Sequence, residues 1–266
     1  MTDHNFKYRN GKIHYTDSGK GKVIVLLHGY LETSEVWRGF AEKLAEKYRI
    51  IVPDLPGHGQ SDIFREMHSM EFMAEIIEEL LNDLKIEKVF LTGHSLGGYV
   101  TLAFVEKFHK RLSGYCLLHS HPLADSPEAF EKRKREINMV QAGQKDLIYP
   151  DNITKMFATS NIEKNRTSLE RSKKIASVIH GEGIIAILKG MMARPSRVGV
   201  MEEGEVPCLW ILGAMDNYIN YEEVRGKVRL PANSEILILE NSGHMGFVEE
   251  EELSIKAIDT FIMKLE

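Results

Sequence analysis

The sequence has only two cysteines in 266 residues, too few for a disulfide framework. Cys116 and Cys208 each lie in a short apolar run, so we expect both to be reduced core residues. No stretch approaches the roughly 18 consecutive apolar residues of a membrane helix. The first nine residues also lack the apolar run of a signal peptide. These absences predict a cytoplasmic protein with no membrane span.

An excess of basic residues is missing as well. Lys and Arg number 34 against 39 Asp and Glu, which gives a net charge of −5. Nucleic-acid binding proteins usually present a basic face, so we expect no nucleic-acid partner. The one basic run, residues 132–135, lies between Glu131 and Glu136 in a helical pattern and is typical of a solvated helix face.

What the sequence does contain is an alternation of short apolar runs with amphipathic helical patterns. Continuous apolar runs are typical of parallel strands that helices cover on both faces. An N-terminal hairpin precedes them, with Asn10–Gly11 as its predicted turn. The fold class is therefore α/β, a mostly parallel, doubly wound sheet of about eight strands. The predicted sheet strands after the hairpin are residues 23–27, 50–52, 89–92, 115–118, 208–212 and 236–239.

Residues 122–196 break the alternation, because helical patterns follow one another there with no strand-like run between them. The first of these helices has Ser126 as its expected N-cap and Pro127 in its first turn. We interpret 122–196 as a helical cap inserted into a core formed by residues 1–121 and 197–266.

A candidate nucleophile follows the strand at 89–92. Gly93-His94-Ser95-Leu96-Gly97 matches the G-x-S-x-G pattern and leads from a predicted strand into a predicted helix. In that context the sharp turn exposes the serine hydroxyl, and the backbone N–H of Leu96 at the helix start can donate to an oxyanion.

Two further motifs complete a resemblance to the α/β-hydrolase family that covers nearly all of the chain except the cap. His28-Gly29-Tyr30 follows the first strong strand, and the segment Asp54–Ser61 has the D-x-x-G-x-G-x-S pattern. The resemblance implies that the backbone N–H groups of Tyr30 and Leu96 form the oxyanion hole. It implies structural roles for His28 and for His58.

The base and the acid are expected after the last two strands. The family's catalytic histidine lies after the last strand, where this chain has His244, and the acid follows the preceding strand at Asp216. The order Ser95, Asp216, His244 is the one expected for this fold. Asp125 is a rival acid, because some family members place the carboxylate after the strand at 115–118.

The substrate wall is less well defined. We predict pocket roles for His119 and His121, which end a strand, and for four methionines: Met191, Met192, Met215 and Met245. Methionines adapt to irregular apolar groups, so a partly apolar small molecule is the expected substrate. For Arg194 we weigh binding of a substrate carboxylate against a solvated side chain, and the solvated alternative is favoured. A metal pair at His119 and His121 is disfavoured because no carboxylate cluster completes it.

The expected activity is hydrolysis of a carboxylic ester, thioester or lactone through an acyl-enzyme, with no cofactor and no metal. A serine at position 95 argues against the dehalogenase and epoxide-hydrolase branches, which attack through aspartate. Carbon–carbon bond hydrolases rank lower because many carry tryptophan where this chain has Met245. A ligand-sensing protein of low turnover stays open, and the oligomeric state is not predicted.

Overall fold

The computed structural model describes residues 1–265, which form an eight-stranded sheet with the order β1-β2-β4-β3-β5-β6-β7-β8. The pairs β1–β2 and β2–β4 are antiparallel, and the other neighbours are parallel. This confirms the predicted fold class. The strands are β1 (Thr2–Tyr8), β2 (Gly11–Gly19), β3 (Val23–Leu27), β4 (Arg49–Pro53), β5 (Val89–His94), β6 (Leu112–Leu118), β7 (Cys208–Gly213) and β8 (Glu235–Leu239).

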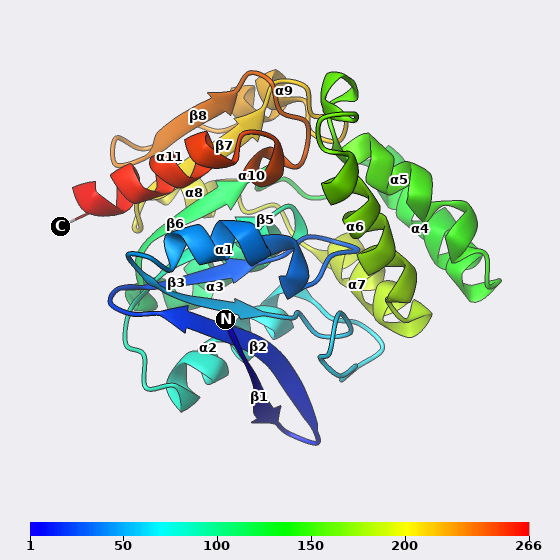
Figure 1. The fold of residues 1–266 in the computed structure, drawn as a ribbon, viewed down its shortest axis with the longest axis horizontal. Coiled ribbons are helices and arrows are strands. Elements are labelled where there is room, and N and C mark those ends of the chain that lie inside the picture. The colour runs from blue at the N-terminus through cyan, green and yellow to red at the C-terminus, as the bar shows by residue number, and fades with distance from the viewer. Residues whose placement is uncertain (266) are drawn as a thin grey trace.

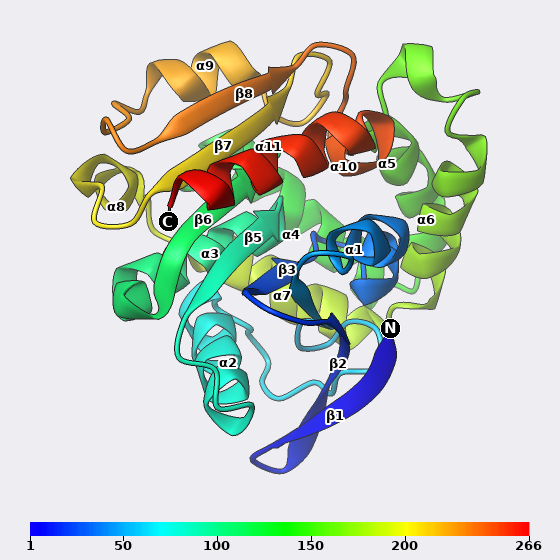
Figure 2. The same cartoon turned by 60° about the vertical axis from the view of Figure 1, so that its left-hand side comes forward.

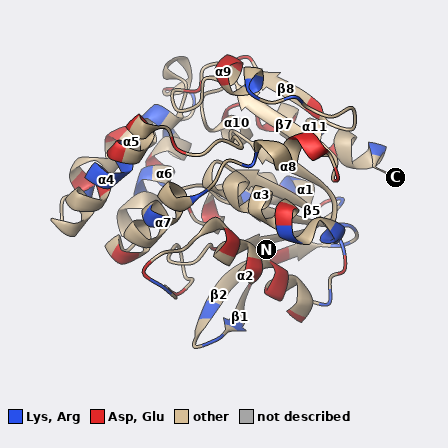
Figure 3. Ribbon diagram, turned by 180° about the vertical axis from the view of Figure 1, so that it is seen from behind, with Lys and Arg blue, Asp and Glu red and all other residues tan. Residues whose placement is uncertain are grey.

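Helices cover both faces of the sheet. Helices α1 (Arg38–Leu44) and α11 (Glu251–Lys264) lie on one face, while α2 (Met70–Asp83), α3 (Leu96–Phe108) and α8 (Val198–Glu203) lie on the other (Figures 1 and 2). The central strands are apolar throughout for this reason: residues 24–27 of β3 are all fully buried. Charged residues lie mainly on the outer helices and loops (Figure 3). Two short helices, α9 (Tyr221–Gly226) and α10 (Gly246–Glu249), flank β8 in the chain.

Local sequence signals explain where the main helices begin. The Ser69 hydroxyl accepts a hydrogen bond from the Phe72 N–H at 3.2 Å, and Ser126 caps the N–H of Ala129 at the same distance. Both N-caps satisfy a donor that the first helical turn leaves unpaired. The N-cap at Ser126 was predicted from the sequence, and the structure confirms it.

The hairpin turn differs from the prediction by one residue. Tyr8 pairs with Gly11, so the two turn residues are Arg9 and Asn10, and Arg9 takes the positive φ of 51°. Gly11 begins β2 instead. A Cβ at Gly11 would lie 2.8 Å from Oδ2 of Asp62, so the glycine allows that carboxylate to approach the strand.

The segment 122–196, called here the cap segment, consists of helices and turns between β6 and β7. Its helices are α4 (Pro127–Gln141), α5 (Tyr149–Met156), α6 (Arg166–Val178) and α7 (Gly181–Ala193). They lie beyond the arrowheads of the central strands (Figure 1). The cap segment thus stands over the carboxyl ends of the strands, where an open α/β sheet binds its ligands.

Among residues 1–265, no single helix is long and apolar enough to cross a membrane, although α6 and α7, bent by 99°, meet the length and composition criteria as a pair. The two cysteines are free and buried in β6 and β7, as predicted.

Candidate active site

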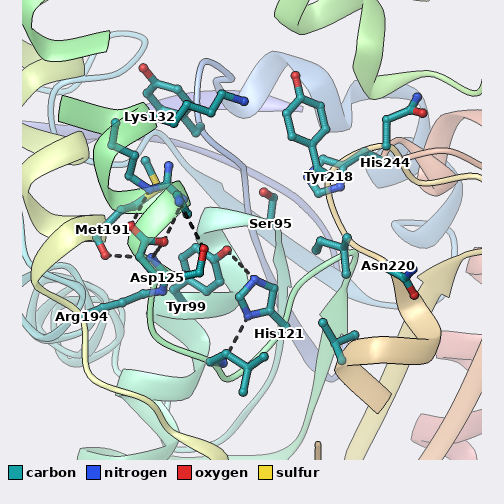
Figure 4. A pocket seen from close by; sticks show the side chains of 18 of the residues that line it. Ser95, Tyr99, His121, Asp125, Lys132, Met191, Arg194, Tyr218, Asn220 and His244 are labelled. Carbon is teal, nitrogen blue, oxygen red and sulfur yellow. Dashed lines mark hydrogen bonds and ion pairs between the residues drawn. The ribbon is translucent and has the colours of Figure 1, made fainter. Parts of the chain in front are cut away.

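The predicted nucleophile occupies the turn between β5 and α3. Ser95 has φ 48° and ψ −112°, a strained conformation that costs about 1–3 kcal/mol. A Cβ on Gly93 would lie 2.2 Å from the carbonyl oxygen of Gly97, so this turn requires glycine there. Ser120 donates its hydroxyl hydrogen to the Ser95 carbonyl oxygen at 2.7 Å and fixes the turn. Ser95 lines a cavity at the carboxyl edge of the sheet (Figure 4).

The predicted base and acid are hydrogen-bonded to each other. Nδ1 of His244, in the loop after β8, lies 2.7 Å from Oδ2 of Asp216, in the loop after β7. The other carboxylate oxygen of Asp216 accepts the backbone N–H groups of Tyr218 and Ile219 at 2.8 and 3.1 Å. A proton on Nδ1 leaves Nε2 of His244 as the basic nitrogen. His244 also lines the cavity.

Electrostatic interactions favour the charged form of both partners. Burial alone would raise the pKa of the Asp216 carboxyl, but the charge of His244 and hydrogen bonds from His119 and His244 hold that pKa well below its ordinary value. Burial lowers the pKa of His244, and the adjacent Asp216 carboxylate more than offsets this, so the pKa is raised. The pair therefore has the properties of a general base with its orienting carboxylate.

A second histidine lies behind the acid. His119 follows β6 with a positive φ of 46°, and its Nδ1 lies 3.5 Å from Oδ2 of Asp216. Its Nε2 accepts the backbone N–H of Gly246 at 3.0 Å, so the proton of a neutral ring must be on Nδ1, facing the carboxylate. Burial lowers the pKa of His119 to about 4, which keeps the ring neutral. His119 is thus placed to orient the acid rather than to touch a substrate.

Ligand atoms of His119, Asp216 and His244 lie within 4.8 Å of one another, close enough to hold a metal ion. Hydrogen bonds account for the Asp216 and His244 atoms without one, whereas Nδ1 of His119 has only a 3.5 Å contact with the carboxylate within residues 1–265. Nδ1 of each histidine faces the carboxylate, and Nε2 of His119 accepts from Gly246. A cation between the three groups would have to displace both Nδ1 protons, so the arrangement fits a hydrogen-bonded His244–Asp216 pair with His119 beside it better than a metal centre.

The two predicted oxyanion donors belong to neighbouring strands. In the parallel pair β3–β5, Leu27 lies opposite Gly93, so the loops after these strands leave the sheet at the same edge. Tyr30 lies in the first loop and lines the cavity, and Leu96 is the first residue of α3. An N–H in the first turn of a helix has no partner within the helix and is free to donate to an anion.

A buried contact between a carboxylate and an imidazole ring, Glu32 with His94, connects these loops. Nδ1 of His94 lies 2.9 Å from Oε2 of Glu32, and Nε2 of His94 lies 2.8 Å from the carbonyl oxygen of His244. The same Glu32 oxygen accepts the N–H of Gly29 at 2.5 Å. Burial would raise the pKa of Glu32, but His94 holds it below its ordinary value. One carboxylate and one ring therefore join the loop of Tyr30, the Ser95 turn and the loop of His244.

The cavity has a volume of about 850 Å³, the size of a small-molecule site. Of the six side chains predicted for the substrate wall, His121 and Met191 line it. The other four lie elsewhere in the described chain, and the prediction for them is corrected. His119 and Met245 are fully buried in the core, Met192 is half-buried, and Met215 is turned to solvent with 42% of its surface exposed. Sequence position near the acid or base did not reveal the direction of these side chains.

Cations outnumber acids around the cavity, in contrast to the chain as a whole, whose net charge is −5. Within residues 1–265, the lining includes five basic residues: Lys132, Arg133, Lys155, Arg194 and Lys227. The acidic residues of the lining are Asp125, Glu136 and Glu223.

Asp125, the rival catalytic acid, is paired with two arginines. Its oxygens accept from Nε of Arg133 and from Nη1 of Arg194, both at 2.7 Å. Burial would raise the pKa of Asp125, but the two guanidinium groups lower it. Two expectations are corrected: Arg194 is buried, with 5% of its surface exposed, and Arg133 turns from the basic run toward the cavity. No local sequence pattern indicated that these arginines pair with Asp125, and Arg194 lies 69 residues from it in the sequence.

With this geometry in hand, the chain can be compared with known proteins. A model of the family described as alpha/beta hydrolase fold matches residues 22–251. The chain belongs to the alpha/beta hydrolase fold family. This agrees with the resemblance seen in the motifs around Tyr30, Asp54 and Ser95.

Individual relatives of this member of the fold family include proteins named as an esterase and as a hydrolase. A thermophilic esterase from Thermogutta terrifontis is 28% identical, with a TM-score of 0.92, over 100% of this chain and 99% of that one. The 2-hydroxy-6-oxononadienedioate/2-hydroxy-6-oxononatrienedioate hydrolase of Escherichia coli is 34% identical over 113 residues, 40% of this chain and 39% of that protein. An uncharacterized Mycobacterium tuberculosis protein is 44% identical over 91 residues, 34% of this chain, and the match spans only 27% of that relative's length.

The sequence analysis missed three side chains that connect the loops around the cavity. None of the three is a predicted nucleophile, base, acid or oxyanion donor: they are Glu32, His94 and Glu249. Glu249 accepts the N–H groups of Gly243 and of Ala158 at 2.9 and 2.8 Å, which ties the loop of His244 to the cap segment. The only local sequence signal for the role of Glu32 was its position three residues after Gly29 of the His-Gly pair. The sequence around Glu249 contained no such signal.

Proposed function

We propose that this protein is a serine hydrolase that cleaves a carboxylic ester, thioester or lactone of a small molecule through an acyl-enzyme on Ser95. The observation that carries the proposal is the geometry of one cavity. Ser95 and His244 both line it, and Asp216 is hydrogen-bonded to the far side of the His244 ring. A serine hydroxyl is a weak nucleophile, so a base and an orienting carboxylate are what it needs for acyl transfer.

In the proposed mechanism, Nε2 of His244 removes the proton from the Ser95 hydroxyl as its oxygen attacks the substrate carbonyl carbon. The carbonyl oxygen becomes an oxyanion and accepts hydrogen bonds from the N–H groups of Tyr30 and Leu96. His244 then gives its proton to the leaving alcohol, thiol or ring oxygen. Water, deprotonated by His244, hydrolyses the acyl-enzyme and restores the serine. Asp216 stabilises the imidazolium that forms in each half-reaction.

Similarity along the whole chain to the Thermogutta esterase favours an ester over other scissile bonds. A second candidate is hydrolysis of a carbon–carbon bond, favoured by the partial match to the E. coli 2-hydroxy-6-oxononadienedioate hydrolase. In this chain Met245 follows His244, where many of those hydrolases have tryptophan, so the ester ranks first.

The test is covalent labelling with a fluorophosphonate, read by intact mass, together with turnover of p-nitrophenyl esters of increasing acyl length. We expect one label on the wild type, none on Ser95→Ala, and hydrolysis of at least the short esters. Ser126→Ala is the matched control, since Ser126 also lines the cavity but caps α4.

Each outcome has a separate meaning. Labelling with negligible turnover of any ester would favour the carbon–carbon hydrolase or a ligand-sensing role. Labelling that persists in Ser95→Ala, or is absent from the wild type, would refute the acyl-enzyme on Ser95.

A further inference from the structure

The end of the cavity formed by the cap segment contains a buried group of charges, called here the arginine cluster: Asp125, Arg133 and Arg194. Both oxygens of the Asp125 carboxylate are used by Arg133, through Nε at 2.7 Å and Nη2 at 3.3 Å. Nη1 of Arg194 donates to the same carboxylate at 2.7 Å and to the Met191 carbonyl oxygen at 2.8 Å. The side chains of Asp125 and Arg194 are 3% and 2% exposed.

This cluster has an unbalanced charge. Two guanidinium groups share one carboxylate, so a full positive charge is left over at a largely buried position. In addition, Nε of Arg194 is buried and has no hydrogen-bond partner within residues 1–265. Burying an unpaired charge is costly unless another group compensates it. An arrangement of this kind is completed by an anion, and the cavity is where an anion can enter.

The cluster is also close to the candidate nucleophile. Tyr99 lies one helical turn after Ser95 on α3, about 6 Å along the helix axis. The guanidinium carbon of Arg194 lies 3.9 Å from the centre of the Tyr99 ring. In the cavity, Arg194 and Asp125 lie on one side of Ser95, while His244, Tyr218 and Asn220 lie on the other (Figure 4). A ligand of a few carbon atoms can therefore reach from Ser95 to the arginines.

The other groups near the cluster do not cancel its charge. Burial, followed by the charges of Arg194 and Arg133, lowers the pKa of His121 to about 3, so this ring is neutral. Lys132 adds a further cation on the same helix as Arg133. Glu136 of that helix also lines the cavity; it accepts from Asn152 and interacts electrostatically with Lys132 and Arg133. Two acids, Asp125 and Glu136, therefore face three cations, Lys132, Arg133 and Arg194, and the excess of positive charge remains.

We propose that the arginine cluster binds a carboxylate of the substrate, so that the preferred substrates are small esters that carry a free carboxylate a few bonds from the scissile carbonyl. This rests on the proposed ester hydrolysis at Ser95 and adds the substrate class. Bidentate contact with a carboxylate is the geometry for which guanidinium groups are suited.

The experiment compares esters that differ only in the remote charge. Monomethyl glutarate is paired with its neutral carboxamide analogue, and 3-acetoxypropanoate with 3-acetoxypropanamide, which places the charge on the acyl or the alcohol side. The measured quantity is the ratio of kcat/KM for the acid to that for the amide. We expect the wild type to favour the acid of at least one pair by tenfold or more, as one charge-assisted contact provides roughly 10–100-fold.

Substitutions then move this ratio in opposite directions. Arg194→Met and Arg133→Met each leave a neutral pair and should lower the ratio roughly 10–100-fold. Asp125→Asn leaves both cations without a counterion and should raise it. Arg135→Met is the control, because Arg135 is an exposed residue of the same helix outside the cavity lining and should leave the ratio unchanged. Two arginine variants are included in case one fails to fold, which circular dichroism would reveal.

The outcomes separate this inference from the proposed function. If the neutral esters are hydrolysed but Arg194→Met and Arg133→Met do not lower the acid-to-amide ratio of kcat/KM, the arginine cluster is not a carboxylate site. The proposed esterase activity would be unaffected by that result. If no ester is hydrolysed, calorimetric binding to Ser95→Ala decides the matter. The carboxylate site is supported, without esterase activity, if Ser95→Ala binds monomethyl glutarate but not its amide and if the additional substitution Arg194→Met abolishes that binding. Equal binding of the two compounds refutes the site.

Discussion

The two ends of the cavity are built in different ways. At the sheet end, Ser95, Asp216 and His244 each follow a strand, and parallel strands bring their carboxyl ends to one edge. At the cap end, Asp125 precedes α4, while Arg194 follows α7, 69 residues later in the chain. The sheet end is fixed by backbone topology, whereas the cap end depends on how helices pack.

This difference suggests which end of the cavity determines the type of reaction and which determines substrate selectivity. Groups at strand ends keep their relative positions whatever the cap contains, which suits a constant reaction. Side chains from an insertion can change without altering the sheet, which suits a variable substrate. In this chain each buried carboxylate of the sheet end faces a histidine ring, with Glu32 against His94 and Asp216 against His244. The cap end retains an excess of cations.

Replacing the acid is expected to have the largest effect at the sheet end. Asp216→Asn removes the carboxylate that holds the proton on Nδ1 of His244, so the ring can turn its wrong tautomer toward Ser95. We expect kcat for a neutral ester to fall by about 10⁴-fold with an unchanged circular dichroism spectrum. Asp125→Asn, at the cap end, should lose far less on the same neutral ester. A larger loss for Asp125→Asn would reverse the assignment of the acid and abolish the distinction between the two ends.

This contrast also explains what could be predicted from the sequence. The residues of the proposed triad could be placed at one edge of the sheet because each follows an apolar run and a turn signal, and the parallel strands end at that edge. The strands themselves were visible as continuous apolar runs, such as residues 23–27. Local patterning is enough wherever backbone hydrogen bonds determine the position of a side chain.

Side-chain direction and long-range pairing were not predictable in this way. Met215 and Met245 adjoin the acid and the base in sequence, yet one is exposed and the other is buried in the core. Arg133 looked like part of a solvated basic run until the fold brought Asp125 against it. A periodic pattern identifies a buried face, but the partner across that face is set by tertiary packing, and a single sequence does not contain that pairing in local form.

The next largest effect concerns the buried Glu32–His94 pair at the sheet end. Glu32→Gln removes the carboxylate that faces Nδ1 of His94, whose other ring nitrogen contacts the His244 carbonyl oxygen. Breaking a buried pair on one side costs about 3–5 kcal/mol, so the free energy of unfolding in urea should fall by that amount. Turnover should fall as well, mainly through kcat, because the loops of Tyr30 and His244 lose a common anchor.

The matched control for this change is Glu35→Gln. Glu35 pairs with Arg38 and with Arg171 of the cap segment, but its side chain is 49% exposed. Exposed pairs contribute about 0–1 kcal/mol, so this variant should differ little from the wild type in urea. Equal losses for Glu32→Gln and Glu35→Gln would show that the sheet end does not depend on its buried charges.

The smallest effect, and the finest test of the sheet end, is the pH dependence of kcat/KM for a neutral ester, whose own charge does not change. His244 must be unprotonated to act as a base, and its pKa is raised in the folded protein by Asp216. Activity should therefore be lost as the pH falls through an apparent pKa above the ordinary histidine value of about 6.5. In Asp216→Asn, burial still lowers the pKa of His244 but no carboxylate raises it. The residual activity should therefore be lost at a lower pH than the activity of the wild type. A wild-type limb at or below pH 6.5, unmoved by Asp216→Asn, would mean that the carboxylate does not control the base and that another group titrates in the reaction.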